Sequence, residues 1–171
     1  GVIYNDGGVY QAAGASIQFA SGIAFNNNSG GLIDVAVGMV DMAGFLNQSG
    51  TVHVADGATF QKQAGFTNYG TLSGSGTIQV GAAQAVVNEG VIAPGDSAGT
   101  LTIAGNLTLT GDSVLDMELG GTGVGDSDRL HVTGSVVLDG ALDASLLGYT
   151  PVNADAITLI TMGGTSSGTF D

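Results

Sequence analysis

Three glycines stand twenty residues apart in this chain, at positions 50, 70 and 90. Each one follows an asparagine by two or three residues and precedes a segment in which apolar residues alternate with polar ones. A fixed period of this length predicts coils stacked on one another, because a single unit of this size cannot bury its apolar side alone. A chain built in this way is expected to present a binding surface rather than an enclosed active site.

A fourth copy of the period appears if Gly31 is the equivalent glycine, since Ile33 and Val35 then take the places of Val52 and Val54. Asparagine and glycine both tolerate positive φ, which suits the tight corners of a coil. Stacked asparagines could also share side-chain hydrogen bonds between coils. We therefore predict four structural corners, at Asn28 with Gly31, Asn47 with Gly50, Asn68 with Gly70, and Asn88 with Gly90.

Short segments with period-two alternation recur along the chain and predict strands with one buried face. A β-sandwich and a solenoid both fit short strands with regular turns, but sandwich strands have no reason to keep a constant spacing. The fold class expected is therefore all-β, a right-handed parallel β-helix with about 20-residue coils and about eight coils in all. Residues 1–171 form a single continuous β-helix in this interpretation, with regular coils over 1–95 and less regular coils over 96–171.

The charge balance is one-sided, with fifteen acidic residues against Lys62 and Arg129 and a net charge of −13. Such a chain repels phosphate backbones and anionic lipid, so nucleic acid is excluded as a partner. No apolar run reaches the length of a membrane-spanning helix, so membrane insertion is not expected. Cysteine is absent, which leaves no disulfide framework, thiol nucleophile or cysteine metal site.

From Asn88 to Ile103 the chain reads NEGVIAPGDSAGTLTI. This stretch resembles the recurrent NxGxIxPGxSxGTLTI pattern of the passenger region of bacterial autotransporters, and residues 128–142 and 168–170 continue the likeness. The resemblance implies export, a place on the bacterial cell surface or in the secreted fraction, and adhesion or self-association. The membrane barrel and signal-peptide pattern of that family are not found within these residues, and both ends look cut or processed from a longer polypeptide.

Three Gly-Asp-Ser triplets and an Asp-x-x-His ending at His131 imitate motifs of hydrolases that need a layered α/β fold. Helix-forming segments are missing, and the triplets are explained as turns, so no catalytic residue and no cofactor site are predicted. Asp112, Asp116 and Glu118 could approach the paired carboxylates of a glycosidase, but no aromatic platform for a sugar lies near them. His53 and His131 are expected at outward polar positions.

The segment Gly120–Asp126 nearly matches a calcium-binding nonapeptide repeat, with its aspartate one place late and no tandem copy. Asp126 and Asp128 are the candidate calcium ligands, because carboxylate oxygens suit this cation. A solvated acidic loop without metal is the competing and simpler interpretation.

The function expected is that of a non-catalytic extracellular structural or adhesive β-helix segment of a bacterial surface protein. Its partners would be cell-surface or extracellular ligands, or other copies of itself. The alternative is a self-assembling subunit of an extracellular filament or sheath, because no capping helix is seen at Gly1–Gly14 or after Ala156, and open strand edges can stack. A glycan-active β-helix enzyme is a distant third hypothesis.

Overall fold

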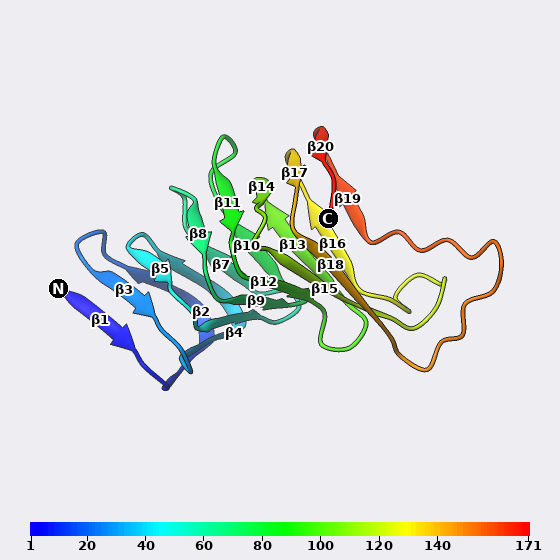
Figure 1. The fold of residues 1–171 in the computed structure, drawn as a ribbon. Helices are drawn as coiled ribbons and strands as arrows, with labels where there is room; N and C mark the ends of the chain where they lie inside the picture. The colour runs from blue at the N-terminus through cyan, green and yellow to red at the C-terminus, as the bar shows by residue number, and fades with distance from the viewer.

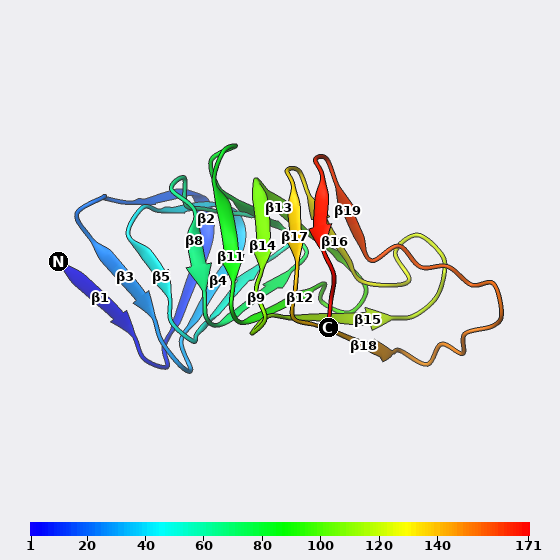
Figure 2. The same ribbon diagram turned by 45° about the horizontal axis from the view of Figure 1, so that its top comes forward.

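The computed structural model describes residues 1–171, and every side chain among them except those of Ala13 and Ala15. The described chain is all-β, with twenty strands and no helix. Successive coils follow one another along the molecule from the N-terminal strand to the C-terminal strands (Figures 1 and 2). Every pairing between named strands is parallel, and the prediction of a stacked parallel β-solenoid is confirmed.

One eight-stranded sheet, here column A, takes one strand from every coil. Its strands are β1 (Val2–Asn5), β3 (Ala24–Asn27), β5 (Phe45–Asn47), β8 (Phe66–Asn68), β11 (Ala85–Asn88), β14 (Asn106–Leu109), β17 (Val136–Leu138) and β20 (Ser166–Gly168).

A twelve-stranded sheet supplies the other two sides of each coil. In the first coils the long strands β2 (Val9–Phe19) and β4 (Leu32–Met42) run along both sides without a break. Later coils divide this path in two. Column B continues with β6 (Thr51–Val54), β9 (Thr71–Gly74), β12 (Val91–Pro94), β15 (Val114–Leu119) and β18 (Ala141–Leu146). Column C continues with β7 (Thr59–Gln61), β10 (Thr77–Gln79), β13 (Thr100–Ala104), β16 (Arg129–Val132) and β19 (Ile160–Met162).

The core is a set of inward rows, each made by equivalent residues of successive coils. In column B, Ile33, Val52, Leu72, Ile92 and Leu115 are paired in register and fully buried. Because alternate residues of a strand face opposite sides, most strands of the twelve-stranded sheet put their apolar residues inside and their polar ones outside, whereas β18 is exposed along its whole length. Burying each large aliphatic side chain stabilises the fold by about 1.5–3 kcal/mol, and this repeated gain holds the coils together.

Phenylalanines fill the interior of the early coils. Phe45 packs edge-on against Phe60 and Phe66, with ring centroids 4.7 and 5.4 Å away. Edge-to-face contacts of this kind are favourable because the positive ring edge meets the negative ring face.

Coil length grows toward the C-terminus while the stacking stays in register. Stacked asparagines of column A are 20–22 residues apart in the first coils. His131 and Thr161, which are partners in column C, are separated by 30 residues. The extra residues lie in corner loops, so strict spacing is lost without loss of the stack. No described helix is long and apolar enough to cross a membrane.

The longest corner segment joins β18 to β19 and projects away from the stack (Figures 1 and 2). Leu146 and Leu147 are exposed there, and Tyr149 is half-buried. Asp155 closes a small local turn by accepting hydrogen bonds from the Tyr149 hydroxyl and from the Val152 amide.

We expect chymotrypsin to cut the folded chain first between Leu146 and Val152, because proteases act on exposed segments with few packing contacts. Mass spectrometry of early digestion products would show a large resistant fragment that ends in this segment. Early cleavage at the buried Phe45 or Phe60 would instead indicate that the coils open readily.

Candidate functional site

A ladder of buried asparagines runs up the end of column A, where each strand turns into the corner. Nδ2 of one asparagine donates to Oδ1 of the next, over 2.9, 2.9, 2.6 and 2.7 Å. The members are Asn5, Asn27, Asn47, Asn68 and Asn88. The last four have no exposed surface, so these amides can be satisfied only inside the protein. The ladder ties five successive coils together through side chains as well as through strands.

The predicted equivalence of Asn28 with Asn47 is wrong by one residue, although Asn28 itself lies in the corner. Asn27, and not Asn28, pairs with Asn47. The corner that follows Asn27 is longer than those that follow Asn47, Asn68 and Asn88, and it is closed by the Gly31 amide, which donates to the Asn28 carbonyl at 2.9 Å. Asn28 lies outside the ladder and donates to the Asp6 carboxylate.

The predicted reason for the corner glycines is also wrong. Gly31, Gly50, Gly70 and Gly90 are not among the described residues with positive φ, and neither are the ladder asparagines. A Cβ on Gly70 would instead lie 2.0 Å from the Gly50 carbonyl oxygen, and one on Gly90 would lie 2.2 Å from that of Gly70. These positions need glycine because adjacent coils approach each other too closely for any side chain.

The ladder ends where Leu109 stands opposite Asn88. Two hydroxyls of the next corner take over there. Ser113 Oγ and Thr110 Oγ1 donate to the Asn88 carbonyl at 2.7 and 3.0 Å, while Asn88 Nδ2 turns to the Gly90 carbonyl at 2.8 Å. The amide row therefore stops without a buried donor left unpaired.

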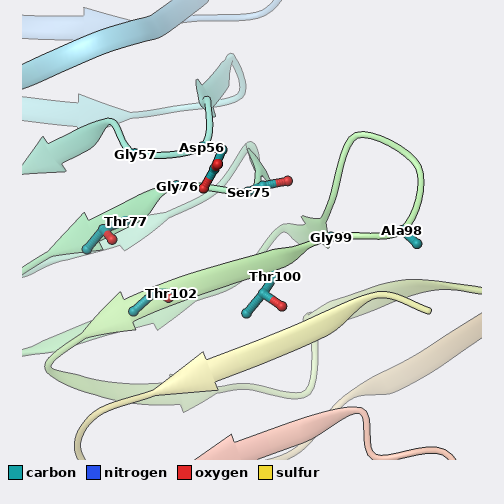
Figure 3. Close-up of a pocket in the computed structure, with 9 residues that line it drawn as sticks. All are labelled: Asp56, Gly57, Ser75, Gly76, Thr77, Ala98, Gly99, Thr100 and Thr102. Carbon is teal, nitrogen blue, oxygen red and sulfur yellow. The ribbon is translucent and has the colours of Figure 1, made fainter. Parts of the chain in front are cut away.

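A polar groove of about 630 Å³ lies on the outer surface, at the corner between columns B and C (Figure 3). It is formed by three successive coils. The Asp56–Gly57 turn bounds one side, and Ala98–Gly99 with the following strand, which carries Thr100 and Thr102, bounds the other. The segment 75–77 lies between the two sides.

Asp128 holds one edge of this groove in place. The residue is 2% exposed. Its Oδ1 accepts a hydrogen bond from the Gly99 amide at 3.0 Å, and its Oδ2 accepts one from the Glu118 amide at 2.8 Å. Burial raises the pKa of this carboxyl above its ordinary value; the two amide hydrogen bonds oppose the rise, and the nearby charges of Glu118 and Asp116 add to it.

This raised pKa predicts a pH-dependent contribution to stability. The folded chain keeps a proton on Asp128 at a pH where the unfolded chain has released it. The contribution is therefore complete below the ordinary aspartate pKa and is lost as pH rises through the folded pKa. Calorimetry of the wild type and Asp128→Asn should show a difference in Tm that is largest at acidic pH and shrinks toward neutrality.

The exposed Asp126, on the same loop, provides the matched control. At a fixed pH, Asp126→Asn should change Tm much less than Asp128→Asn, because the asparagine oxygen can keep the one hydrogen bond of this side chain, from the Gly123 amide. At every pH Asp128→Asn should also carry a cost of about 1–3 kcal/mol, because its single amide oxygen cannot accept from both backbone amides. A Tm difference that grows toward neutral pH would contradict the assignment.

The structure places the two candidate calcium ligands in different surroundings. Asp126 is exposed and Oδ2 accepts from the Gly123 amide at 3.0 Å, whereas both oxygens of Asp128 accept from backbone amides. Asp128 also lines a second cavity of about 240 Å³ together with Asp116 and Glu118. Among the described side chains, no three acidic or histidine groups are arranged to hold a metal ion. The calcium assignment stays a prediction.

The motifs that imitate a hydrolase are not brought together. His131 Nδ1 lies 2.9 Å from Thr161 Oγ1 on the outer face of column C. Ser127 is buried and donates to the Gly121 carbonyl at 2.8 Å. Ser97 has a positive φ of 86° and lies exposed in the corner between β12 and β13. Asp112 lies in the turn before β15, apart from the cavity that Asp116 and Glu118 line.

One contact among outward residues was not predicted from the sequence. His53 Nδ1 lies 3.3 Å from Ser73 Oγ, and His53 Nε2 lies 3.6 Å from Asp96 Oδ1. His53 and Ser73 are paired in column B, so the twenty-residue period could have placed them side by side. Asp96 comes from a corner loop whose path the period does not determine.

Lys62 and Arg129 lie apart, and each donates a hydrogen bond to a backbone carbonyl. Lys62 Nζ donates to the Gly65 carbonyl at 3.0 Å, and burial lowers its pKa. Arg129 Nε donates to the Thr158 carbonyl at 3.3 Å. Neither base lines the polar groove.

Comparison with known proteins gives one family and one relative. The model of the Haemagglutinin repeat family matches residues 1–111. A stretch of 64 residues is 47% identical to the Adhesin BmaC autotransporter of Brucella suis biovar 1 (strain 1330). This stretch is 35% of the chain but only 2% of that adhesin, so the chain corresponds to a small part of the relative's length.

No solved structure gives a significant match. The expected resemblance to autotransporter passengers is confirmed, and the family match falls mainly on the coils that the sequence predicts as regular. Since the match covers well over half of the residues, the chain belongs to the haemagglutinin repeat family.

Proposed function

We propose that this chain is a non-catalytic adhesive segment of an extracellular bacterial surface protein. The observation that carries the proposal is a continuous eight-stranded parallel sheet in a chain of the haemagglutinin repeat family. The adhesin that shares a 47% identical stretch supports the same role. Each coil adds about 4.8 Å to the stack, so the chain acts as a stiff support that displays its outer faces.

The interior of the coils is filled, so a ligand can contact only the outer surface. Apolar rows and the asparagine ladder fill the inside. Outward residues of neighbouring coils are held in register, for example Thr59, Thr77 and Thr102 in column C. Such a surface presents evenly spaced side chains at little entropic cost on binding, because the sheet has already fixed them.

The surroundings of the histidines support the non-catalytic part of the proposal. The Ser73–His53–Asp96 contacts are long, and Asp96 is largely exposed, so the histidine is poorly oriented as a base. The cavity beside Ser73 is lined by Asp116, Glu118 and Asp128. Three acidic groups would destabilise the negative charge that develops on an acyl or phosphoryl group under attack.

The test is adhesion of the purified chain displayed on beads. Beads coated with the folded chain should bind to host cells or to extracellular matrix more strongly than beads coated with the same chain after heat unfolding. Multivalent display is used because single contacts of this kind are weak and many together are strong. Equal binding by the folded and unfolded chain over a panel of surfaces would contradict the proposal.

A further inference from the structure

The polar groove at the corner between columns B and C offers hydroxyl groups that the protein does not use. Ser75, Thr77, Thr100 and Thr102 all line it. None of these four hydroxyls makes a hydrogen bond within the described part of the chain, whereas Thr110 and Ser113 at the ladder's end do. A free hydroxyl can donate one hydrogen bond and accept two. The groove therefore suits a ligand that is itself rich in both donors and acceptors.

Charge narrows the class of ligand. Asp56 is the one carboxylate that lines the groove, and it can only accept hydrogen bonds. Asp96 lies in the loop just before Ala98 and adds a second negative charge nearby. With a net charge of −13 on the whole chain, an anionic ligand would be repelled. An anionic ligand is therefore disfavoured, and four unpaired hydroxyls against a single lining carboxylate favour an uncharged ligand with many hydroxyls over a cationic one.

The backbone of the groove is shaped for close approach. A Cβ on Gly76 would lie 2.4 Å from the Ala55 carbonyl oxygen, and one on Gly99 would lie 2.8 Å from the Gly95 Cα. Glycine is thus required at both positions, which keeps these parts of the groove lining free of side chains. Asp128 fixes the Gly99 edge through its hydrogen bond to that amide. The shape is therefore built into the fold before a ligand binds.

We propose that this groove binds a neutral oligosaccharide. Thr77 and Thr102, which are paired in adjacent coils, contact successive hydroxyls of the sugar, and Asp56 accepts from a further one. The groove holds no aromatic ring, so each single contact is weak and adhesion depends on many copies acting together. The assignment rests on the proposed adhesive function and names the ligand class for it.

A glycan array probed with the bead-displayed chain tests the proposal. Neutral oligosaccharides should bind, and the sulfated and sialylated forms of the same glycans should bind at least tenfold less. Printing each glycan both on a lipid carrier and on a protein carrier distinguishes recognition of glycolipids from recognition of glycoproteins. Stronger binding to the charged forms, or no binding to any neutral glycan, would overturn the proposal.

Threonine-to-valine changes locate the site because they remove a hydroxyl with almost no change in shape. The double variant Thr77→Val and Thr102→Val should bind neutral glycans about tenfold more weakly, as expected for the loss of two hydrogen bonds. Thr59→Val is the matched control. Thr59 is paired with Thr77 in the preceding coil but does not line the groove, so its loss should leave binding within about twofold.

A second variant blocks the groove without removing a contact. Gly57 has a φ of 73° and open space around its Cβ position, so asparagine is accommodated there. Gly57→Asn adds a side chain to the lining of the groove and should weaken glycan binding, while circular dichroism of the variant checks that the small strain at this φ leaves it folded. Full binding by both the double variant and Gly57→Asn would refute the site. Adhesion to cells without binding to neutral glycans would refute the ligand class and leave the adhesive function standing.

Discussion

Replacing Asn27 by leucine should lower the free energy of unfolding by about 3 kcal/mol. Its amide accepts from Asn5 Nδ2 and donates to Asn47 Oδ1 and to the Thr51 carbonyl, each at 2.9 Å. Leucine has a similar size but offers no hydrogen bond, so several buried polar atoms lose a partner at once. Each buried group left unpaired costs about 1–3 kcal/mol. Urea unfolding followed by far-ultraviolet circular dichroism would measure the change.

The neighbouring Asn26 provides a control with the same substitution on the same strand. Its side chain faces outward, and its Oδ1 is buried without a hydrogen-bond partner. Removing an unsatisfied oxygen costs nothing, so Asn26→Leu should leave the free energy of unfolding within about 0.5 kcal/mol of the wild type, or raise it. Equal losses in the two variants would mean that the ladder contributes no more than any surface asparagine.

The coils and their core could be predicted from the sequence because the stack imposes the same period on every coil. Alternating residues then decide which side chains face inward. The same rule could have identified the ladder. Each member after the first follows an inward apolar residue by two positions, as Asn47 follows Phe45 and Asn68 follows Phe66. Applied to Phe25, this rule selects Asn27 in place of Asn28.

The polar groove could not be predicted in this way. It joins a turn at residues 56–57, the segment 75–77 and the segment 98–102, which come from three coils with corners of different length. Corner length is set by local turns and by single anchors such as the Asp128–Gly99 hydrogen bond. The twenty-residue period predicts the strands that all coils share, whereas the groove depends on the corners, whose lengths differ from coil to coil.

Gly70→Ala should destabilise the fold by about 3 kcal/mol or more. The new Cβ would lie 2.0 Å from the Gly50 carbonyl oxygen and 2.8 Å from Asn47 Nδ2. The carbonyl belongs to the backbone of the preceding coil and accepts a hydrogen bond from the Thr71 amide at 2.9 Å. Relief of the clash would separate the two coils and weaken both this bond and the ladder, a large cost for one methyl group. Thermal and urea unfolding would both report it.

Gly111→Ala is the matched control, because nothing lies within 4 Å of its Cβ position. It should change stability by no more than about 0.5 kcal/mol, or raise it slightly by restricting the unfolded chain. Gly70→Asn separates the two explanations of the repeat. If positive φ were the reason for glycine, asparagine would be tolerated better than alanine. If close approach is the reason, asparagine should be at least as harmful, since every side chain begins with the Cβ that clashes.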